Sequence, residues 1–222
     1  LIIENLFYSL QRASHKTTLK ISFIKRMIYF CGIHYKKKFK INNSNTKYVQ
    51  KNQQKIVFIG GPGTGKTTVL NALKTKGYCC FNEVSRAVTL KAQQQGIEQL
   101  FLTEPLLFSE MLLKGREEQY LDAAKSKKDI IFFDRGIPDV HAYMNYFKTD
   151  FPSLFIEKSK EYKYDLIFHF SPWKEIYTID NERYETFEES KTIDTFLIKA
   201  YTALEYKIIN VPFGTISERT NF

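Results

Sequence analysis

The chain has 222 residues, of which 43% are hydrophobic and 26% charged, and a formal net charge of +9. This composition is typical of a globular protein with one sizeable core, and it excludes a disordered tail and a collagen-like chain. The three cysteines, Cys31, Cys79 and Cys80, have neither metal-type nor disulfide-framework spacing, which favours a reducing compartment and predicts a cytoplasmic protein.

The positive charge is concentrated at the start of the chain. Residues 1–55 hold 12 of the 33 Lys and Arg and only Glu4 among the acids, which leaves 21 basic and 23 acidic residues in 56–222. Contact with nucleic acid or a membrane surface is therefore expected only through this segment. The apolar run 27–33 is too short to cross a bilayer, so we expect no transmembrane span there. We expect residues 1–54 to be a basic extension that is disordered or read from upstream of the true start. A binding surface for membrane or nucleic acid and an ordered segment are the alternatives.

A glycine-rich loop follows the short apolar run 55–59 and precedes apolar residues at helical spacing over 69–73. The loop fits the phosphate-binding (Walker A) pattern Gly-x-x-x-x-Gly-Lys-Ser/Thr, and a strand before it and a helix after it are the context that this motif requires. The residues expected to bind the phosphates of ATP, or of GTP, are Gly60, Gly61, Pro62, Gly63, Thr64, Gly65, Lys66, Thr67 and Thr68.

The chemistry of phosphate binding explains these residue types. Glycine lets successive N–H groups turn inward around an anion, and the helix that begins near Lys66 adds the positive end of its dipole. Lys66 would reach the β- and γ-phosphates, and the Thr67 hydroxyl would ligate Mg²⁺. The alternative is a glycine-rich turn that binds no ligand.

Four more apolar stretches predict strands, and helical stretches separate them. The strands are expected over residues 78–81, 130–133, 166–170 and 207–211, and the clearest helices over 105–126 and 188–204. Fully apolar strands separated by helices predict a parallel sheet with helices on both faces, an α/β fold. In such sheets ligands lie at the carboxyl ends of the strands.

Charged residues stand at two of these strand ends. Asp134 follows four apolar residues, as in the Walker B pattern, and would bind Mg²⁺. Arg135 would neutralise charge on a transferring phosphoryl group, or form a structural salt bridge. Glu83 would accept the proton of an acceptor hydroxyl, with Arg86 contacting the acceptor. The alternative for Glu83 is an acid favoured by a helix N-terminus, although Ser85 as the cap of that helix would leave Glu83 free.

Two further features have two interpretations each. The polar segment 180–185 predicts a lid that brings Arg183 over the phosphates, or a solvated helix start. The aromatic residues Phe101, Phe108, Tyr120 and Tyr143 stand at helical spacing, which favours a core role over stacking on a ligand.

Together these residues resemble the P-loop kinases of nucleosides and nucleotides, and a family of small AAA-labelled ATPases similar to the ribosylnicotinamide kinase domain of NadR. The resemblance covers about residues 55–222 and rests on segments 56–68, 83–86, 133–139, 180–183 and 206–212.

This resemblance implies a three-layer α/β/α fold with a five-stranded parallel sheet in the order 2-3-1-4-5. It places Glu83 where nucleoside kinases have their base, Asp134 and Arg135 where they have an acidic–Arg pair, and Pro212 in a turn that borders the adenine. Gly136 stands where these kinases usually have Ser, and the lid has one Arg where several are common.

We therefore expect a Mg²⁺- and ATP-dependent phosphotransferase that binds a nucleotide and a small-molecule acceptor, which is a metabolite or a nucleoside. The catalytic residues would be Lys66, Glu83, Asp134, Arg135 and Arg183, with Glu83, Arg86 and Arg135 contacting the acceptor. One alternative is a regulatory protein that hydrolyses or senses an NTP without an organic acceptor. Another treats the basic N-terminal segment as a tether on a similar NTP-binding core.

Overall fold

A computed structural model describes residues 53–94, 96–97, 100–178 and 185–222. Within these residues, one sheet has five strands in the order β2-β3-β1-β4-β5, and every neighbouring pair is parallel. The strands are β1 (Gln54–Ile59), β2 (Cys79–Phe81), β3 (Ile130–Asp134), β4 (Leu166–His169) and β5 (Ile208–Asn210). The predicted α/β fold and its strand order are confirmed.

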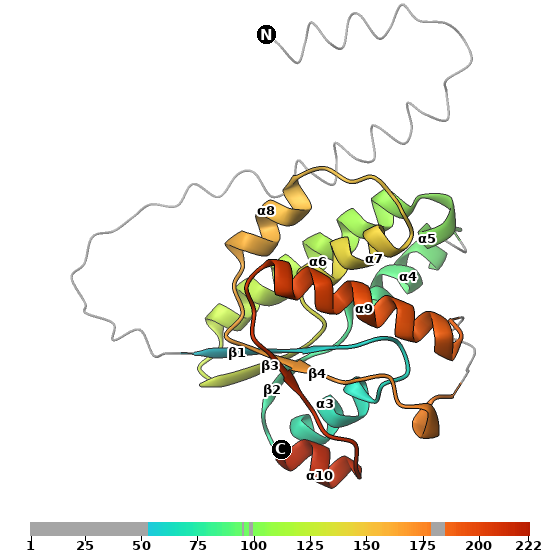
Figure 1. Ribbon diagram of the computed structural model, residues 1–222. Helices are drawn as coiled ribbons and strands as arrows, with labels where there is room; N and C mark the ends of the chain where they lie inside the picture. Colours follow the sequence, from blue (N-terminus) through green and yellow to red (C-terminus); the bar gives the residue numbers. More distant parts are fainter. Residues whose placement is uncertain (1–52, 95, 98–99, 179–184) are drawn as a thin grey trace, which may run out of the picture. The chain divides into compact units, whose positions relative to one another are not determined.

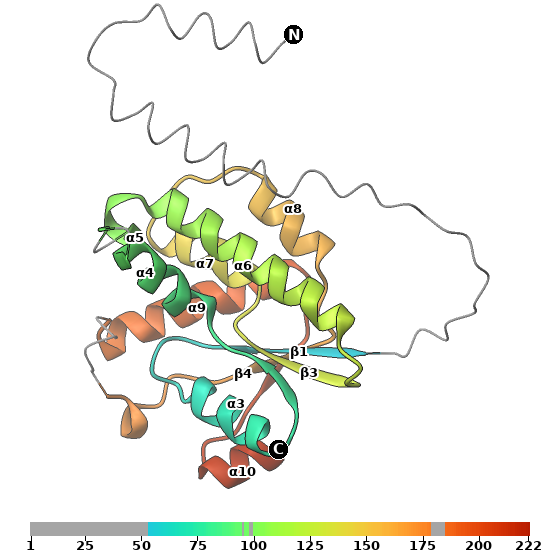
Figure 2. The same cartoon turned by 180° about the vertical axis from the view of Figure 1, so that it is seen from behind.

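Helices cover both faces of this sheet and make a three-layer α/β/α arrangement (Figure 1 and Figure 2). One face carries α3 (Lys66–Thr75) and the short α10 (Ile216–Asn221). The helices on the other side are α4 (Val84–Gln94), α5 (Leu100–Thr103), α6 (Pro105–Lys125), α7 (Pro138–Tyr146), α8 (Leu154–Glu161) and α9 (Phe187–Ala203). A 3₁₀ turn, η1 (Lys174–Ile176), follows β4.

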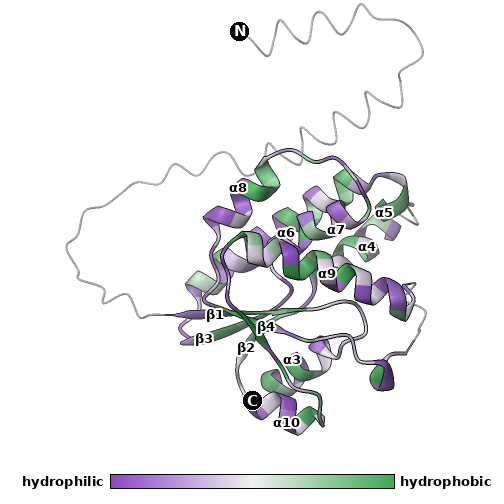
Figure 3. Cartoon of the chain, viewed as in Figure 1, coloured by the Kyte–Doolittle hydropathy of each residue, from purple (hydrophilic) through white to green (hydrophobic). Residues whose placement is uncertain are grey.

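Two apolar layers lie above and below the sheet because strand side chains alternate between its faces. Ile56 and Phe58 of β1 pack toward α3. Val57 and Ile59 pack on the opposite face, in a cluster that includes Tyr201 of α9. The middle parts of the strands are accordingly hydrophobic, whereas β1 begins with polar residues (Figure 3).

The register of the sheet brings three strand ends to one edge. Phe58 of β1 is level with Asp134 of β3, and Ile59 is level with His169 of β4. The loop after β1 therefore starts beside the ends of both neighbouring strands. This edge is where the phosphate loop and the charged residues meet.

Two predictions concern residues that the structure does not describe. The basic extension predicted for residues 1–54 lies outside the described residues except for Gln53 and Gln54, and the lid residue Arg183 lies in the undescribed segment 179–184. In the described part of the chain, no helix combines the length and apolar character that a bilayer span needs.

Candidate active site

The phosphate loop joins β1 directly to α3. Gly63 and Gly65 have φ of 78° and 82°, in the left-handed region that disfavours a side chain. The ammonium of Lys66 donates to the carbonyl oxygens of Gly60 and Gly61, each at 2.8 Å, and to the Thr64 hydroxyl at 3.1 Å. Burial, and then the charge of Arg135, lower the pKa of Lys66 to about 8. The loop thus gathers a buried cation and a helix N-terminus at one point.

Thr67 and Asp134 form the second part of the site. The Thr67 hydroxyl donates to Asp134 Oδ2 at 2.6 Å. Asp134 is buried at the end of β3, and its burial raises the pKa of the carboxyl. A hydroxyl and a carboxylate in contact form an oxygen donor set that suits Mg²⁺, which prefers one or two carboxylates together with phosphate oxygens and water. Among the described residues, no group of three or more His, Cys, Asp and Glu could hold a metal without such help.

Glu83 is held between two arginines. Its Oε1 accepts from Arg116 of α6 at 3.0 Å, and its Oε2 forms an ion pair with Arg135. Burial alone would raise the pKa of Glu83, but the charges of Arg116 and Arg135 and the N–H of Ser85 lower it. The carboxylate is therefore ionised at neutral pH.

The prediction that Ser85 caps the next helix, leaving Glu83 free, is wrong. The helix begins at Val84, and the Ser85 backbone N–H donates to Glu83 Oε1 at 3.2 Å. Glu83 thus stands just before the helix and accepts from its first turn, in the manner of an N-cap. The interpretation of Glu83 as a helix N-terminal acid is therefore confirmed, and its role as a base or acceptor contact stays a prediction.

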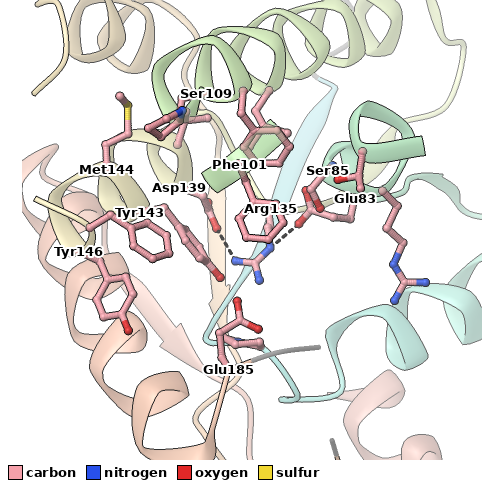
Figure 4. A pocket seen from close by; sticks show the side chains of 18 of the residues that line it. Glu83, Ser85, Phe101, Ser109, Arg135, Asp139, Tyr143, Met144, Tyr146 and Glu185 are labelled. Atoms are coloured by element: carbon pink, nitrogen blue, oxygen red, sulfur yellow. Dashed lines mark hydrogen bonds and ion pairs between the residues drawn. The ribbon is translucent and has the colours of Figure 1, made fainter. Parts of the chain in front are cut away.

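Arg135 has a positive φ of 74°, which is uncommon for a residue with a side chain. Its guanidinium lies 5.1 Å from the centre of the Tyr143 ring and 3.3 Å from Asp139 Oδ1 (Figure 4). Asp139 is fully buried, and it also accepts from the Gly136 N–H at 2.9 Å and from the Tyr201 hydroxyl at 2.6 Å. The structural salt bridge weighed for Arg135 is thus present, within reach of the site.

A cavity of about 710 Å³ connects these groups. Lys66, Thr67 and Asp134 line it at the phosphate loop, and Glu83 and Arg135 line it farther along. Its volume falls in the range of sites that enclose small ligands.

Aromatic side chains form the far wall of the cavity. Phe101, Phe108 and Tyr143 all line it, and Phe108 and Tyr143 also pack against the hydrophobic core, so a core role and a ligand contact both stay predictions for these residues. Tyr120 instead packs against Tyr162 and Tyr164, as expected of a core residue. Helical spacing in the sequence alone does not distinguish residues that pack in the core from residues that line a cavity.

The structure brings most, but not all, of the predicted site residues together. Pro62, Gly63, Lys66, Thr67, Glu83, Arg86, Asp134 and Arg135 line the same cavity. Pro212 is exposed on the connection between β5 and α10, away from the lining of this cavity. The roles of all these residues, including the adenine contact of Pro212, stay predictions.

Three charged residues near the site have no counterpart among the predictions. Arg116 pairs with Glu83, and Arg219 of α10 donates to the Thr64 carbonyl at 3.0 Å. Asp139 forms an ion pair with Arg135 and accepts a hydrogen bond from the Gly136 N–H. Asp139 had a usable signal, because it stands four residues after Arg135 and within the segment 133–139 that carries the resemblance. Arg116 and Arg219 had none, because their contacts are distant in sequence.

A family model described as an AAA domain matches residues 55–219 of the chain. A search of the curated proteins finds no match. Among solved structures, the NadR protein in complex with NAD and AMP-PNP is similar, with 17% identity and a TM-score of 0.56 over 77% of this chain. The chain spans 47% of the length of that NadR chain.

Two other solved structures share the fold. The deoxyadenosine kinase from M. mycoides is 16% identical, with a TM-score of 0.57 over 76% of this chain and 95% of its own. The thymidylate kinase from Candida albicans is also 16% identical, with a TM-score of 0.52 over 77% of this chain and 88% of its own. At these identities the likeness establishes the fold, which is that of P-loop kinases.

Proposed function

Since the chain belongs to the AAA domain family and has the fold of P-loop kinases, we propose that it is a Mg²⁺- and ATP-dependent phosphotransferase acting on a small organic acceptor. The observation that carries this proposal is the cavity, which continues from Lys66 and Thr67 past Glu83 to an aromatic wall. A hydrolase needs room only for water beside the phosphates, whereas this space has the size of a metabolite or a nucleoside.

The phosphate loop would bind ATP, or GTP, through its backbone N–H groups and Lys66. Lys66 is buried and donates to loop carbonyls, so its ammonium is already directed toward the loop. Thr67 and Asp134 would hold Mg²⁺, which would neutralise charge on the phosphates when bound. The contact between their oxygens at 2.6 Å supports this assignment.

Glu83 would accept the proton of the acceptor hydroxyl. Its two arginine partners lower its pKa, so the carboxylate is in the protonation state that a base needs. A low pKa also makes a weak base, and phosphoryl transfer tolerates this because positioning and charge stabilisation dominate its catalysis. Arg135 would release part of its contact with Glu83 to neutralise charge on the transferring group.

The acceptor would lie between Glu83 and the aromatic wall. The aromatic residues Phe101 and Tyr143 line this space, and so does Arg86 of α4. Contact through stacking and hydrogen bonds suits a flat heterocycle that carries a hydroxyl, such as a nucleoside.

One assay tests the proposal against its rival. The full chain is incubated with Mg²⁺, γ-labelled ATP and a pool of nucleosides, nucleoside monophosphates and sugar alcohols. We expect label on an organic product. Release of free phosphate alone would overturn the proposal in favour of an NTP-hydrolysing or NTP-sensing regulatory protein.

A variant pair tests the role of Glu83. Glu83→Gln should abolish transfer while the affinity for ATP stays near that of the wild type. Glu110→Gln, at an exposed position of α6, is the matched control and should transfer normally. Transfer by Glu83→Gln at the wild-type rate would remove Glu83 from the role of base.

A further inference from the structure

Helix α9 contacts the first half of the phosphate loop through two side chains one turn apart. The Ser190 hydroxyl donates to the Pro62 carbonyl at 2.7 Å. The Gly61 backbone N–H donates to Asp194 Oδ1 at 3.1 Å. Helix and loop are in close contact here, because a Cβ on Gly61 would collide with the carbonyl oxygen of Ser190. Ser190 and Asp194 are both buried.

His169 holds the other side of the Asp194 carboxylate. Its Nε2 lies 2.9 and 3.0 Å from the two Asp194 oxygens, and its Nδ1 lies 2.8 Å from the Asn210 side-chain oxygen. His169 ends β4 and is level with Asn210 at the end of β5. The carboxylate is thus fixed from the sheet on one side while it accepts the loop N–H on the other.

The electrostatics of this cluster favour an ionic contact. Burial alone would lower the pKa of His169, but the hydrogen bond and charge of Asp194 and the contact with Asn210 raise it. Both ring nitrogens face oxygen atoms, as they do in a doubly protonated ring. A carboxylate that accepts from both a cationic ring and a backbone N–H makes stronger hydrogen bonds than a neutral acceptor would.

None of Ser190, Asp194, His169 and Asn210 lines the cavity. Ser190 and Asp194 contact the loop through the backbone of Gly61 and Pro62, at the start of the segment expected to bind the phosphates. A loop whose first half is fixed has less conformational freedom to lose when it closes around an anion, and this raises affinity.

We propose that Asp194 and Ser190 are positioning residues that fix Gly61 and Pro62 from α9, so that the phosphate loop is preorganised for nucleotide, with His169 orienting the Asp194 carboxylate. This inference rests on the proposed binding of nucleotide, but it does not depend on which acceptor is used. It assigns to Asp194 and Ser190, which do not line the cavity, an effect on nucleotide affinity through the loop backbone.

The experiment measures the affinity of the full chain for Mg²⁺-ADP and Mg²⁺-ATP by calorimetry, well below the unfolding temperature of each variant. Asp194→Ala should weaken both affinities about tenfold, the size expected for a lost hydrogen bond to a charged group. Asp194→Asn keeps an acceptor for the Gly61 N–H and should recover part of the loss. Ser190→Ala should weaken binding to a smaller extent. Lys199→Ala, at an exposed position of α9, is the control and should bind as the wild type does.

A purely structural role predicts a different pattern. Variants with lower unfolding temperatures but wild-type affinities would overturn the inference and leave the proposed function intact. If Asp194→Ala does not fold, equal affinities of Asp194→Asn, Ser190→Ala and the wild type would overturn it in the same way. Absence of nucleotide binding by the wild type would overturn both proposals.

Discussion

Thr67 donates its hydroxyl hydrogen to Asp134 across 2.6 Å, which joins the first turn of α3 to the carboxyl end of β3. The two residues are 67 positions apart in the chain and meet because β1 and β3 are parallel neighbours whose ends are level. Their oxygens are the ones to which the proposed function assigns Mg²⁺.

We predict that Asp134→Asn removes the effect of Mg²⁺ on nucleotide binding. The amide oxygen of Asn can still accept from Thr67, so the local geometry is kept, but the negative charge that favours a divalent cation is lost. Calorimetric titration with ATP, with and without Mg²⁺, measures the effect. The wild type should bind more tightly with Mg²⁺, whereas the variant should bind equally in both conditions. An unchanged Mg²⁺ effect in Asp134→Asn would place the metal elsewhere.

The contact between Glu83 and Arg116 leads to a stability prediction. The side chain of Arg116 is 4% exposed and that of Glu83 is 13% exposed, so removing either charge leaves its partner poorly compensated. Arg116→Gln should lower the free energy of unfolding by about 3 kcal/mol, as for other buried ion pairs that lose one partner. Because the folded-state pKa of Glu83 is lowered, this contribution is present at neutral pH and is lost as the pH falls below the ordinary value for Glu.

Urea unfolding of Arg116→Gln, Glu83→Gln and the double variant measures the coupling between the two residues. The double variant should lose less stability than the sum of the single variants. The exposed pair Lys125–Asp122 serves as control, and Lys125→Gln should leave stability nearly unchanged. If the stability losses of the two single variants added up to that of the double variant, the contact between Glu83 and Arg116 would contribute nothing to the free energy of unfolding.

The effects of substitutions at Gly136 and Tyr201 on the free energy of unfolding should also be coupled. A Cβ on Gly136 would collide with the Tyr201 hydroxyl oxygen and would lie 3.0 Å from a ring carbon of Tyr164. Gly136→Ala should therefore lower the free energy of unfolding by about 1–3 kcal/mol. In a Tyr201→Phe background the same substitution should cost clearly less, because the hydroxyl in its way is gone. Equal costs in the two backgrounds, measured by urea unfolding, would contradict this account of why the position is glycine.

Local signals were sufficient to predict the parallel strands and the position of the glycine-rich loop between β1 and α3, whereas the strand order came from the family resemblance. Apolar runs bounded by polar residues mark the strands, and the rule that parallel strand ends meet at one edge brings Asp134 to the loop. The partners of Glu83 could not be predicted, because Arg116 reaches it from the middle of a long helix with no motif around it. Ser85 was misassigned as a cap, because a helix start is defined only to within a residue or two by sequence.

The final prediction concerns the stability of the chain in mild acid, through His141 of α7. The residue is 4% exposed, and within the described residues neither ring nitrogen has a hydrogen-bond partner. Burial lowers the pKa of His141 to about 4, although the charge of Asp139 acts in the opposite direction. The ring is thus neutral in the folded chain, whereas in the unfolded chain it takes up a proton as the pH falls below about 6.5.

Because the unfolded state binds the extra proton, stability decreases as the pH falls from about 6.5 toward 4. Between pH 7 and pH 5 this group alone should remove about 2 kcal/mol from the free energy of unfolding.

His141→Leu, close in volume and unable to titrate, should lack this loss. Urea unfolding at pH 7, 6 and 5 should show the difference between variant and wild type shifting in favour of the variant as the pH falls. His169, with its raised pKa, is present in both proteins and cancels in the difference. If the two stability curves ran parallel over this pH range, His141 would not be buried in its neutral form, and its environment on α7 would need to contain a partner for its ring.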